Sequence, residues 1–203
     1  MASHNRDVFV NCPFDHDYQS FFRAIIFVIV RSGFRARCAL ETDDGSENRF
    51  EKICRIIKAC RYGVHDISRT EVDDTHGLPR FNMPLELGVF LGAKRLGSRD
   101  QNAKACIIFD RTRYRFQKYI SDIAGQDIHA HAGTIRTLIV ELASWLRDQA
   151  RDPRIPGGTT IARDFNTFMR RLPRICNGRG LTVDELTFGD YADIVAEYLA
   201  ATV

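Results

Sequence analysis

The chain has 203 residues, a net charge of +3 and ordinary shares of hydrophobic (44%) and charged (27%) residues. This composition excludes a fibrous or wholly disordered protein and suits one main domain with an appendage. The longest apolar run, residues 24–30, is far shorter than the ~20 residues needed to cross a bilayer. Residues 1–7 show no signal-peptide pattern, so we expect a cytoplasmic protein with no membrane partner.

Predicted strands and helices alternate along the first half of the chain. Short runs of β-branched and aromatic residues predict the strands, and dense or periodic apolar residues predict the helices between them. The predicted strands span 7–11, 34–40, 62–68 and 104–110, and the predicted helices span 18–32, 50–60 and a segment that begins near residue 82. This alternation is typical of an α/β protein with an open parallel sheet.

Beyond residue 110 the pattern becomes mostly helical. The sequence predicts a short helix at 114–120, a solvated loop at 129–133, and longer helices at 134–147, 161–172 and 182–200. Pro and Gly residues at 153–158 mark a break between two of these helices. We therefore predict an α/β domain at 1–133 and a helical C-terminal extension at 134–203 that packs on it.

Polar and charged residues follow every predicted strand of the sheet. They lie at Asn11 to Asp15, Glu41 to Gly45, Asp66 to Arg69 and Asp110 to Arg113. In an open parallel sheet, ligands bind outside the carboxyl ends of the strands. We therefore expect the ligand site at this edge, where the helix that carries Glu86 also begins.

The helix that carries Glu86 places one acid in a largely apolar segment. Asn82 is a candidate cap and the fixed φ of Pro84 suits a first turn, so Glu86 is expected within about one turn of the helix start. An acid in that position gains about 0.3–1 kcal/mol from the helix dipole and needs no function to explain it. The alternative interpretation is a reactive carboxylate.

Signatures of several common reactions are missing after the predicted strands. No G-x-S-x-G elbow, P-loop or G-x-G-x-x-G fingerprint follows any of them. Carboxylates remain as candidate reactive groups: Asp66, Glu86 and, as a second acid, Glu41. Since a carboxylate can attack or stabilise an anomeric carbon while its substituent departs, the sequence favours glycosyl-transfer chemistry.

Three segments resemble a known family. They are Asp7 to Phe14 (DVFVNCPF), His65 to Ile67, and Leu85-Glu86-Leu87-Gly88 followed by Leu91, Gly92 and Lys94. These residues resemble the nucleoside 2′-deoxyribosyltransferase family and the wider superfamily that includes TIR domains, many of which cleave NAD. The resemblance covers residues 7–110 and implies a flavodoxin-like sheet, with NAD as a substrate rather than a cofactor.

The resemblance also implies roles for individual residues. Glu86 matches the nucleophile of the transferases, and Asp66 matches the residue that contacts the nucleoside. Asn11, Pro13 and Phe14 match the loop after the first strand that lines the substrate pocket.

Four further residues complete the predicted substrate-binding set. Arg49 and Arg69 are candidates for contact with an anion, because a guanidinium can bind a phosphate through two parallel hydrogen bonds. Ser68 and Asn82 lie on the same predicted edge of the sheet.

Three other features have both a functional and a structural interpretation. His65 could act as a base, but a histidine at the end of a buried strand is more often a hydrogen-bonded core residue. His129 and His131 have a loose metal-ligand spacing, for which a solvated loop is the favoured interpretation, and no metal site is predicted. Basic and aromatic residues alternate over 111–119, where a solvated helix is favoured over a nucleic-acid-binding surface.

These observations predict cleavage or transfer of the N-glycosidic bond of a nucleoside, a nucleotide or NAD, with Glu86 as nucleophile or cation stabiliser. The resemblance implies a place in antiviral defence. The alternative is a non-catalytic TIR-like module that senses a nucleotide signal or binds a protein partner. Expected partners are the small ligand and either a second copy of the chain or another defence protein, whereas nucleic acid is not expected.

Overall fold

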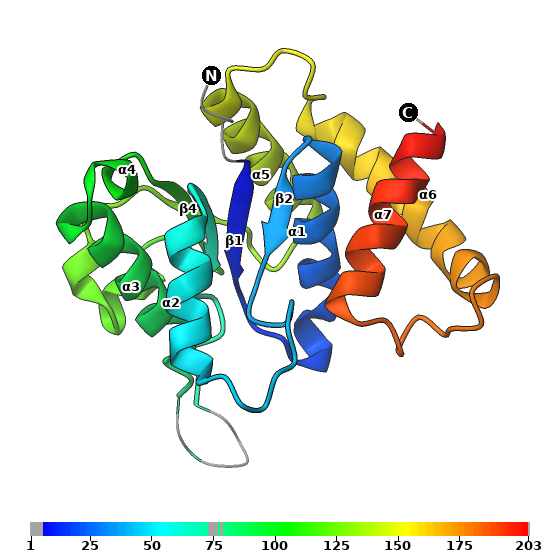
Figure 1. Ribbon diagram of the computed structural model, residues 1–203. Coiled ribbons are helices and arrows are strands. Elements are labelled where there is room, and N and C mark those ends of the chain that lie inside the picture. Colours follow the sequence, from blue (N-terminus) through cyan, green and yellow to red (C-terminus); the bar gives the residue numbers. More distant parts are fainter. Residues whose placement is uncertain (1–5, 73–76, 78, 203) are drawn as a thin grey trace.

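The computed structural model describes residues 6–72, 77 and 79–202, and within them five strands form one parallel sheet (Figure 1). The strands are β1 (Asp7–Asn11), β2 (Arg35–Arg37), β3 (Tyr62–Asp66), β4 (Ala105–Asp110) and β5 (Ile128–Ala130). Their order is β2-β1-β3-β4-β5, which is the flavodoxin-like order. The predicted fold class is therefore confirmed. Residues 73–76 and 78, in the segment between the third strand and the Glu86 helix, lie outside the described residues.

Strand β5 corrects the interpretation of 129–133 as a solvated loop. Ile128 and His129 pair with Ile108 and Phe109 of β4. The strand has only three residues, too few to show the alternation that identifies a strand in a sequence. The second strand was predicted at 34–40, but only Arg35–Arg37 pair with β1, so the prediction was too long.

Helices cover both faces of the sheet (Figure 1). One face is covered by α1 (Gln19–Arg31) and α5 (Ile135–Ala150), and the other by α2 (Arg49–Ala59) and α3 (Asn82–Leu96), which the short α4 (Arg99–Asn102) follows. Short 3₁₀ turns η1 (His16–Tyr18), η2 (Arg115–Lys118) and η3 (Ser121–Ile123) lie in the loops. The predicted short helix at 114–120 is therefore only the turn η2.

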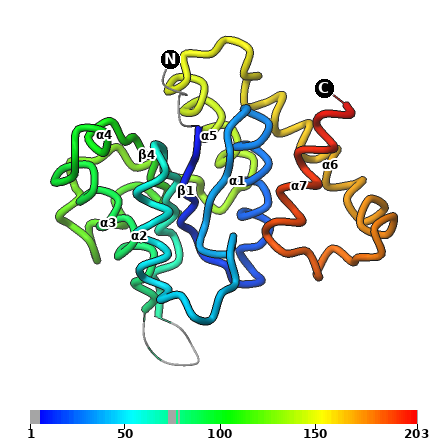
Figure 2. The backbone as a smooth tube through the Cα atoms, viewed as in Figure 1, coloured from blue at the N-terminus to red at the C-terminus, as the bar shows by residue number. Residues whose placement is uncertain are grey.

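The last two helices form a further layer outside α1 (Figure 2). They are α6 (Gly158–Asn177) and α7 (Phe188–Thr202). Phe27 of α1 contacts the rings of Phe165 and Phe168 of α6. This second layer explains why α1 is apolar almost all round, since one of its sides faces the sheet and another faces α6 and α7.

One hydrophobic core joins the sheet to the C-terminal helices. The same cluster contains Val8 and Val64 of the sheet and Leu142, Phe168 and Val195 of the three last helices. The boundary between residues 133 and 134 stays a prediction. Among the described helices, none is long and apolar enough to span a membrane.

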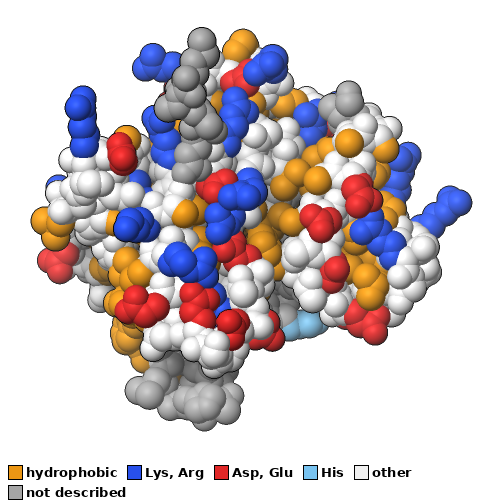
Figure 3. Space-filling model, viewed as in Figure 1, with side chains coloured by type: hydrophobic (Ala, Val, Ile, Leu, Met, Phe, Trp, Pro, Cys, Tyr) orange, Lys and Arg blue, Asp and Glu red, His pale blue; other side chains and the backbone are white. Residues whose placement is uncertain are grey.

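The charged residues on the face shown in Figure 3 are intermixed rather than sorted by sign. Over β1 and β2, Asp7 accepts hydrogen bonds from both Arg35 and Arg37. Arg37 also binds Glu41. Opposite charges are thus paired locally on this part of the surface.

The side chains of β3 alternate between the two faces of the sheet, and this alternation positions the residues of the site. Val64 packs in the core on the α1 and α5 face, whereas the ring of His65 contacts Phe9 and Phe90 on the α2 and α3 face. Because successive side chains of a strand point to opposite faces, Asp66 returns to the α1 and α5 face at the carboxyl end of the strand.

Candidate functional site

Glu86 lies deeper in its helix than the sequence suggests. Helix α3 begins at Asn82, and its N-cap is Phe81, which makes no side-chain cap bond. The prediction that Asn82 caps the helix is therefore wrong, and Glu86 is the fifth helical residue. Since the helix dipole acts mainly within the first turn, dipole stabilisation no longer accounts well for this acid.

Glu86 is a largely buried residue whose carboxyl group has no partner among the described residues. The residue is 8% exposed and makes no hydrogen bond or ion pair with any described residue. Burial raises its pKa to about 7, although the positive charge of Arg49 at the start of α2 opposes this shift. The charge of Glu86 in turn helps to raise the pKa of the thiols of Cys12, which follows β1, and Cys38, which follows β2.

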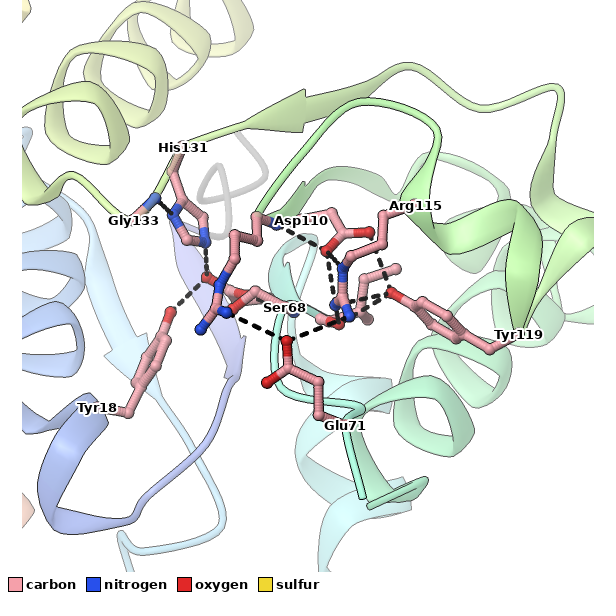
Figure 4. A network of polar contacts seen from close by, with 11 residues as sticks. Tyr18, Ser68, Glu71, Asp110, Arg115, Tyr119, His131 and Gly133 are labelled. Atoms are coloured by element: carbon pink, nitrogen blue, oxygen red, sulfur yellow. Dashed lines mark hydrogen bonds and ion pairs between the residues drawn. The ribbon is translucent and has the colours of Figure 1, made fainter. Parts of the chain in front are cut away.

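Asp66, by contrast, has a hydrogen-bond partner for each of its oxygens, and Figure 4 labels three residues that lie against it, Tyr18, Ser68 and His131. Its side chain is completely buried, Oδ1 accepts the Ser68 N–H at 2.8 Å, and Oδ2 accepts the Tyr18 hydroxyl at 2.5 Å. His131 Nε2 also lies 3.3 Å from Oδ2, although its geometry falls short of a hydrogen bond. His131 Nδ1 accepts the N–H of Gly133, which leaves the proton of the neutral ring on Nε2, facing Asp66.

The two predicted catalytic acids approach the edge of the sheet from opposite faces. Asp66 contacts Tyr18 and His131 on the α1 and α5 face, and Glu86 comes from α3 on the other face. Cys12, just after β1, lies within electrostatic range of both acids, because both charges raise the pKa of its thiol. No hydrogen bond joins Asp66 to Glu86 among the described residues, so the structure brings them to one edge but not into direct contact.

Asn11 connects the first and third strands to the start of α3. Its Nδ2 donates to Met83 O at 2.8 Å and lies 3.0 Å from His65 Nδ1, and all three groups are buried. Burial and the charge of Lys104 lower the pKa of His65 to about 3, so its ring is neutral at physiological pH. The interpretation of His65 as a hydrogen-bonded core residue is confirmed, and Asn11 holds the helix that carries Glu86.

Two predicted site residues have other partners. Glu41 forms a bidentate ion pair with Arg37, with Nη2 and Oε1 2.6 Å apart, which leaves it poorly placed to act as a second acid. Phe14 packs edge-on against Phe22 and lines a cavity of about 100 Å³ that Phe188 of α7 helps to close. Such a volume is below the ~300 Å³ typical of small-molecule sites.

The remaining predicted residues lie around the same edge. Pro13 and Ser68 are buried, whereas Asn82 and Arg49 are exposed at the starts of their helices. Arg69 forms ion pairs with Asp15 and Asp17.

A polar network beside Asp66 was missed in the sequence (Figure 4). Asp110, at the end of β4, is completely buried and binds the guanidinium of Arg115 at 2.7 Å and the hydroxyl of Tyr119 at 3.1 Å. Arg115 and Tyr119 also donate to Ile67 O, which ties the end of β3 to the loop after β4. The only sequence signal was the position of Asp110 after a buried strand.

Exposed apolar side chains gather at this edge as well. Among the described residues, the large exposed ones are Leu40, Phe50, Val72, Phe81, Leu85, Leu96 and Tyr114. All except Leu96 follow the carboxyl end of a strand or lie in the first turns of the helix after it. Exposed apolar surface around a polar edge is typical of a ligand or partner site.

The site offers no evident metal cage, since no group of three or more His, Cys, Asp or Glu side chains in the described part of the chain is arranged to hold an ion. His129 binds Glu141 at 3.0 Å, whereas His131 turns to Asp66. Comparison with known proteins adds no assignment. The sequence matches no protein-family model and no curated protein at a significant level.

Proposed function

We propose that the protein cleaves or transfers the N-glycosidic bond of a nucleoside, a nucleotide or NAD, with Glu86 as the reacting carboxylate. One observation carries the proposal. Glu86 is a largely buried acid that lacks a described partner, on the helix that starts at the edge where flavodoxin-like sheets bind ligands. A buried acid without a partner destabilises a protein, and such groups are concentrated at functional sites.

The chemistry follows from the state of this carboxyl group. With a pKa of about 7, a large fraction of Glu86 is ionised at neutral pH, and the ionised group is weakly solvated. Its oxygen can attack C1′ of the sugar, or stabilise the positive charge that develops there, while the C1′–N bond breaks and its electron pair leaves with the base. Water, or a second base, then bonds to C1′, and the sugar leaves Glu86.

Asp66 has a different role in this proposal from the one that the sequence suggested. Both of its oxygens accept hydrogen bonds within the protein, from Ser68 and Tyr18. It therefore acts as a positioning residue that fixes the loops after β1 and β3. The exposed side chains of Phe81 and Leu85, at the start of the same helix, supply apolar surface against which a base can pack.

The test is release of a free base. Purified protein is incubated with NAD and with a panel of nucleosides and nucleotides, and the products are separated by chromatography. We expect release by the wild type, and a loss of at least about a hundredfold in Glu86→Gln, since the amide can neither attack nor carry the charge. Glu51→Gln, which changes an exposed glutamate of α2, is the matched control and keeps its activity.

Two results would contradict the proposal. Undiminished release by a folded Glu86→Gln variant would show that another group reacts. Absence of release from every substrate would favour the alternative, a non-catalytic module that binds a nucleotide signal or a protein partner at the same edge.

A further inference from the structure

Asp15 lies between two arginines that come from different parts of the chain. Arg80 Nη1 donates to Asp15 Oδ2 at 3.1 Å, and Arg69 Nη2 lies 3.5 Å from Asp15 Oδ1. Asp15 follows β1, Arg69 follows β3, and Arg80 precedes α3. The three side chains, here called the Asp15 clasp, therefore bridge the loops after two neighbouring strands.

The position of the clasp is the one where open parallel sheets bind ligands. In the order β2-β1-β3-β4-β5, the direction of winding reverses between β1 and β3. The crevice at such a switch point is the usual ligand site of this class of fold. Arg80 lies two residues before α3. Asn11, at the start of the loop that carries Asp15, donates to Met83 O of the same helix, so the clasp lies at the start of the helix that carries Glu86.

The contacts of Arg69 are loose. Its guanidinium lies 3.5 Å from Asp15 and 3.6 Å from Asp17, and it makes no hydrogen bond to a described residue. Its side chain is nevertheless only 31% exposed. A guanidinium has five N–H donors, so Arg69 holds hydrogen-bonding capacity toward an anion that the two carboxylates leave unused.

A second carboxylate between two arginines gives a useful comparison. Asp152, at the opposite end of the sheet, accepts hydrogen bonds from Arg154 at 2.9 Å and from Arg6 at 3.3 Å. Both of these arginines donate hydrogen bonds to their carboxylate, as expected of a purely structural ion pair. The Asp15 clasp differs in its loose Arg69 contact and in its place at the ligand edge.

We propose that Arg69 and Arg80 form a binding site for a phosphoryl group, and that Asp15 occupies this site when no ligand is bound. The proposal rests on the function proposed above and narrows its substrate to a phosphate-bearing nucleotide or dinucleotide. A phosphoryl group has more charge and more acceptor oxygens than a carboxylate, so it binds two guanidiniums more strongly. Its binding displaces Asp15 and frees the loop after β1 at the mouth of the site.

Asp15→Asn tests whether Asp15 competes with a phosphoryl group for Arg69 and Arg80. The Asp15 side chain also accepts the N–H of Tyr18 at the start of η1, and an asparagine caps a helix about as well as an aspartate. The variant therefore removes the competing charge and keeps the local fold. Arg69→Gln removes the other half of the interaction, and Asp152→Asn is the matched control.

Binding is measured by calorimetry at constant ionic strength, with inorganic phosphate, adenosine monophosphate and adenosine as probes. We expect Asp15→Asn to tighten phosphate and nucleotide binding by about two- to fivefold, the factor that corresponds to loss of one exposed ion pair. Arg69→Gln weakens binding of both probes and leaves adenosine unaffected. Tighter binding of the nucleotide than of phosphate identifies a nucleotide ligand, and equal binding identifies free phosphate.

Three results would overturn the proposal: no binding of either phosphate-bearing probe, equal binding by Arg69→Gln and the wild type, or equal tightening in Asp15→Asn and Asp152→Asn. The measurement needs no bond cleavage, so it is repeated in Glu86→Gln. Phosphate binding that persists there without any base release by the wild type would refute the proposed reaction and leave the anion site standing. Base release without phosphate binding would refute the anion site and leave the proposed reaction standing.

Discussion

At the scale of single residues, the two acids at one edge of the sheet differ in their hydrogen-bond partners. Asp66 is satisfied by Ser68 and Tyr18, and Glu86 has no described partner. The sequence placed both acids at the edge but could not show which of them has partners within the protein. One partner of Asp66, Ser68, is local, but Tyr18 comes from η1, which is far away in the sequence.

The unpartnered state of Glu86 predicts a dependence of stability on pH. Its pKa is about 7 in the folded protein, against 4.5 for an unperturbed glutamate. Between these values the folded state binds more protons than the unfolded state, so the free energy of unfolding falls as pH rises, by up to about 3 kcal/mol. Glu86→Gln abolishes this loss and is therefore more stable than the wild type at pH 8, with no such gain near pH 4.

Urea unfolding of Glu86→Gln, the wild type and Glu51→Gln at both pH values measures this difference. If Glu86→Gln has no more stability at pH 8 than the wild type, the carboxylate has a stabilising partner, and the account of the site is wrong.

At the scale of elements, local patterns predicted most of the fold. The segments that became β1, β3, β4, α1 and α2 carry strong apolar signals, and these elements were predicted to within a few residues. The failures have physical reasons. Strand β5 is held by its pairing with β4 rather than by its own sequence, and α3 begins at Asn82 without a side-chain cap, so the cap rule misplaced Glu86.

Lys104 shows how a residue that is distant in the sequence can bind the end of a helix. It was predicted only as the first residue of the fourth strand, but it is buried, and its Nζ donates to Ile57 O and Cys60 O at the end of α2. Its ammonium group also lies 4.9 Å from the centre of the Phe90 ring of α3. Lys104 thus joins α2 and α3 at the amino end of β4, whereas the site lies at the carboxyl ends of the strands.

Lys104→Met therefore destabilises the protein, because it removes a donor from two buried carbonyl groups, of which Ile57 O keeps only the N–H of Cys60. We expect the free energy of unfolding to fall by about 2–4 kcal/mol. The exposed Lys58→Met of the same helix is the control and changes it by less than about 0.5 kcal/mol. Similar losses in the two variants, measured by chemical unfolding, would show that the buried contacts of Lys104 contribute little.

At the scale of the whole molecule, the C-terminal helices belong to the core that supports the site. Phe27 of α1 packs on Phe165 and Phe168, and Tyr191 of α7 donates to the backbone of Arg23. Sequence predicted that residues 134–203 are helical and pack on the sheet. It could not show how closely, because contacts between distant segments leave no periodic signal.

A chain that ends at residue 133 is therefore expected not to fold alone. It would lose α5 and expose the apolar side of α1, and the buried area would no longer offset the conformational entropy of folding. Circular dichroism during heating should show a cooperative transition for the full chain and none for residues 1–133. A cooperative transition of the shorter chain would instead support an independent domain at 1–133.

The central claim is that Glu86, a largely buried acid with no partner among the described residues, reacts at an N-glycosidic bond. The pH dependence of kcat/KM for base release tests it most directly. Because the reaction needs the carboxylate, kcat/KM should rise with pH to a plateau, with an apparent pKa near 7. Absence of release at every pH, or a plateau reached already near pH 5.5, would contradict the account.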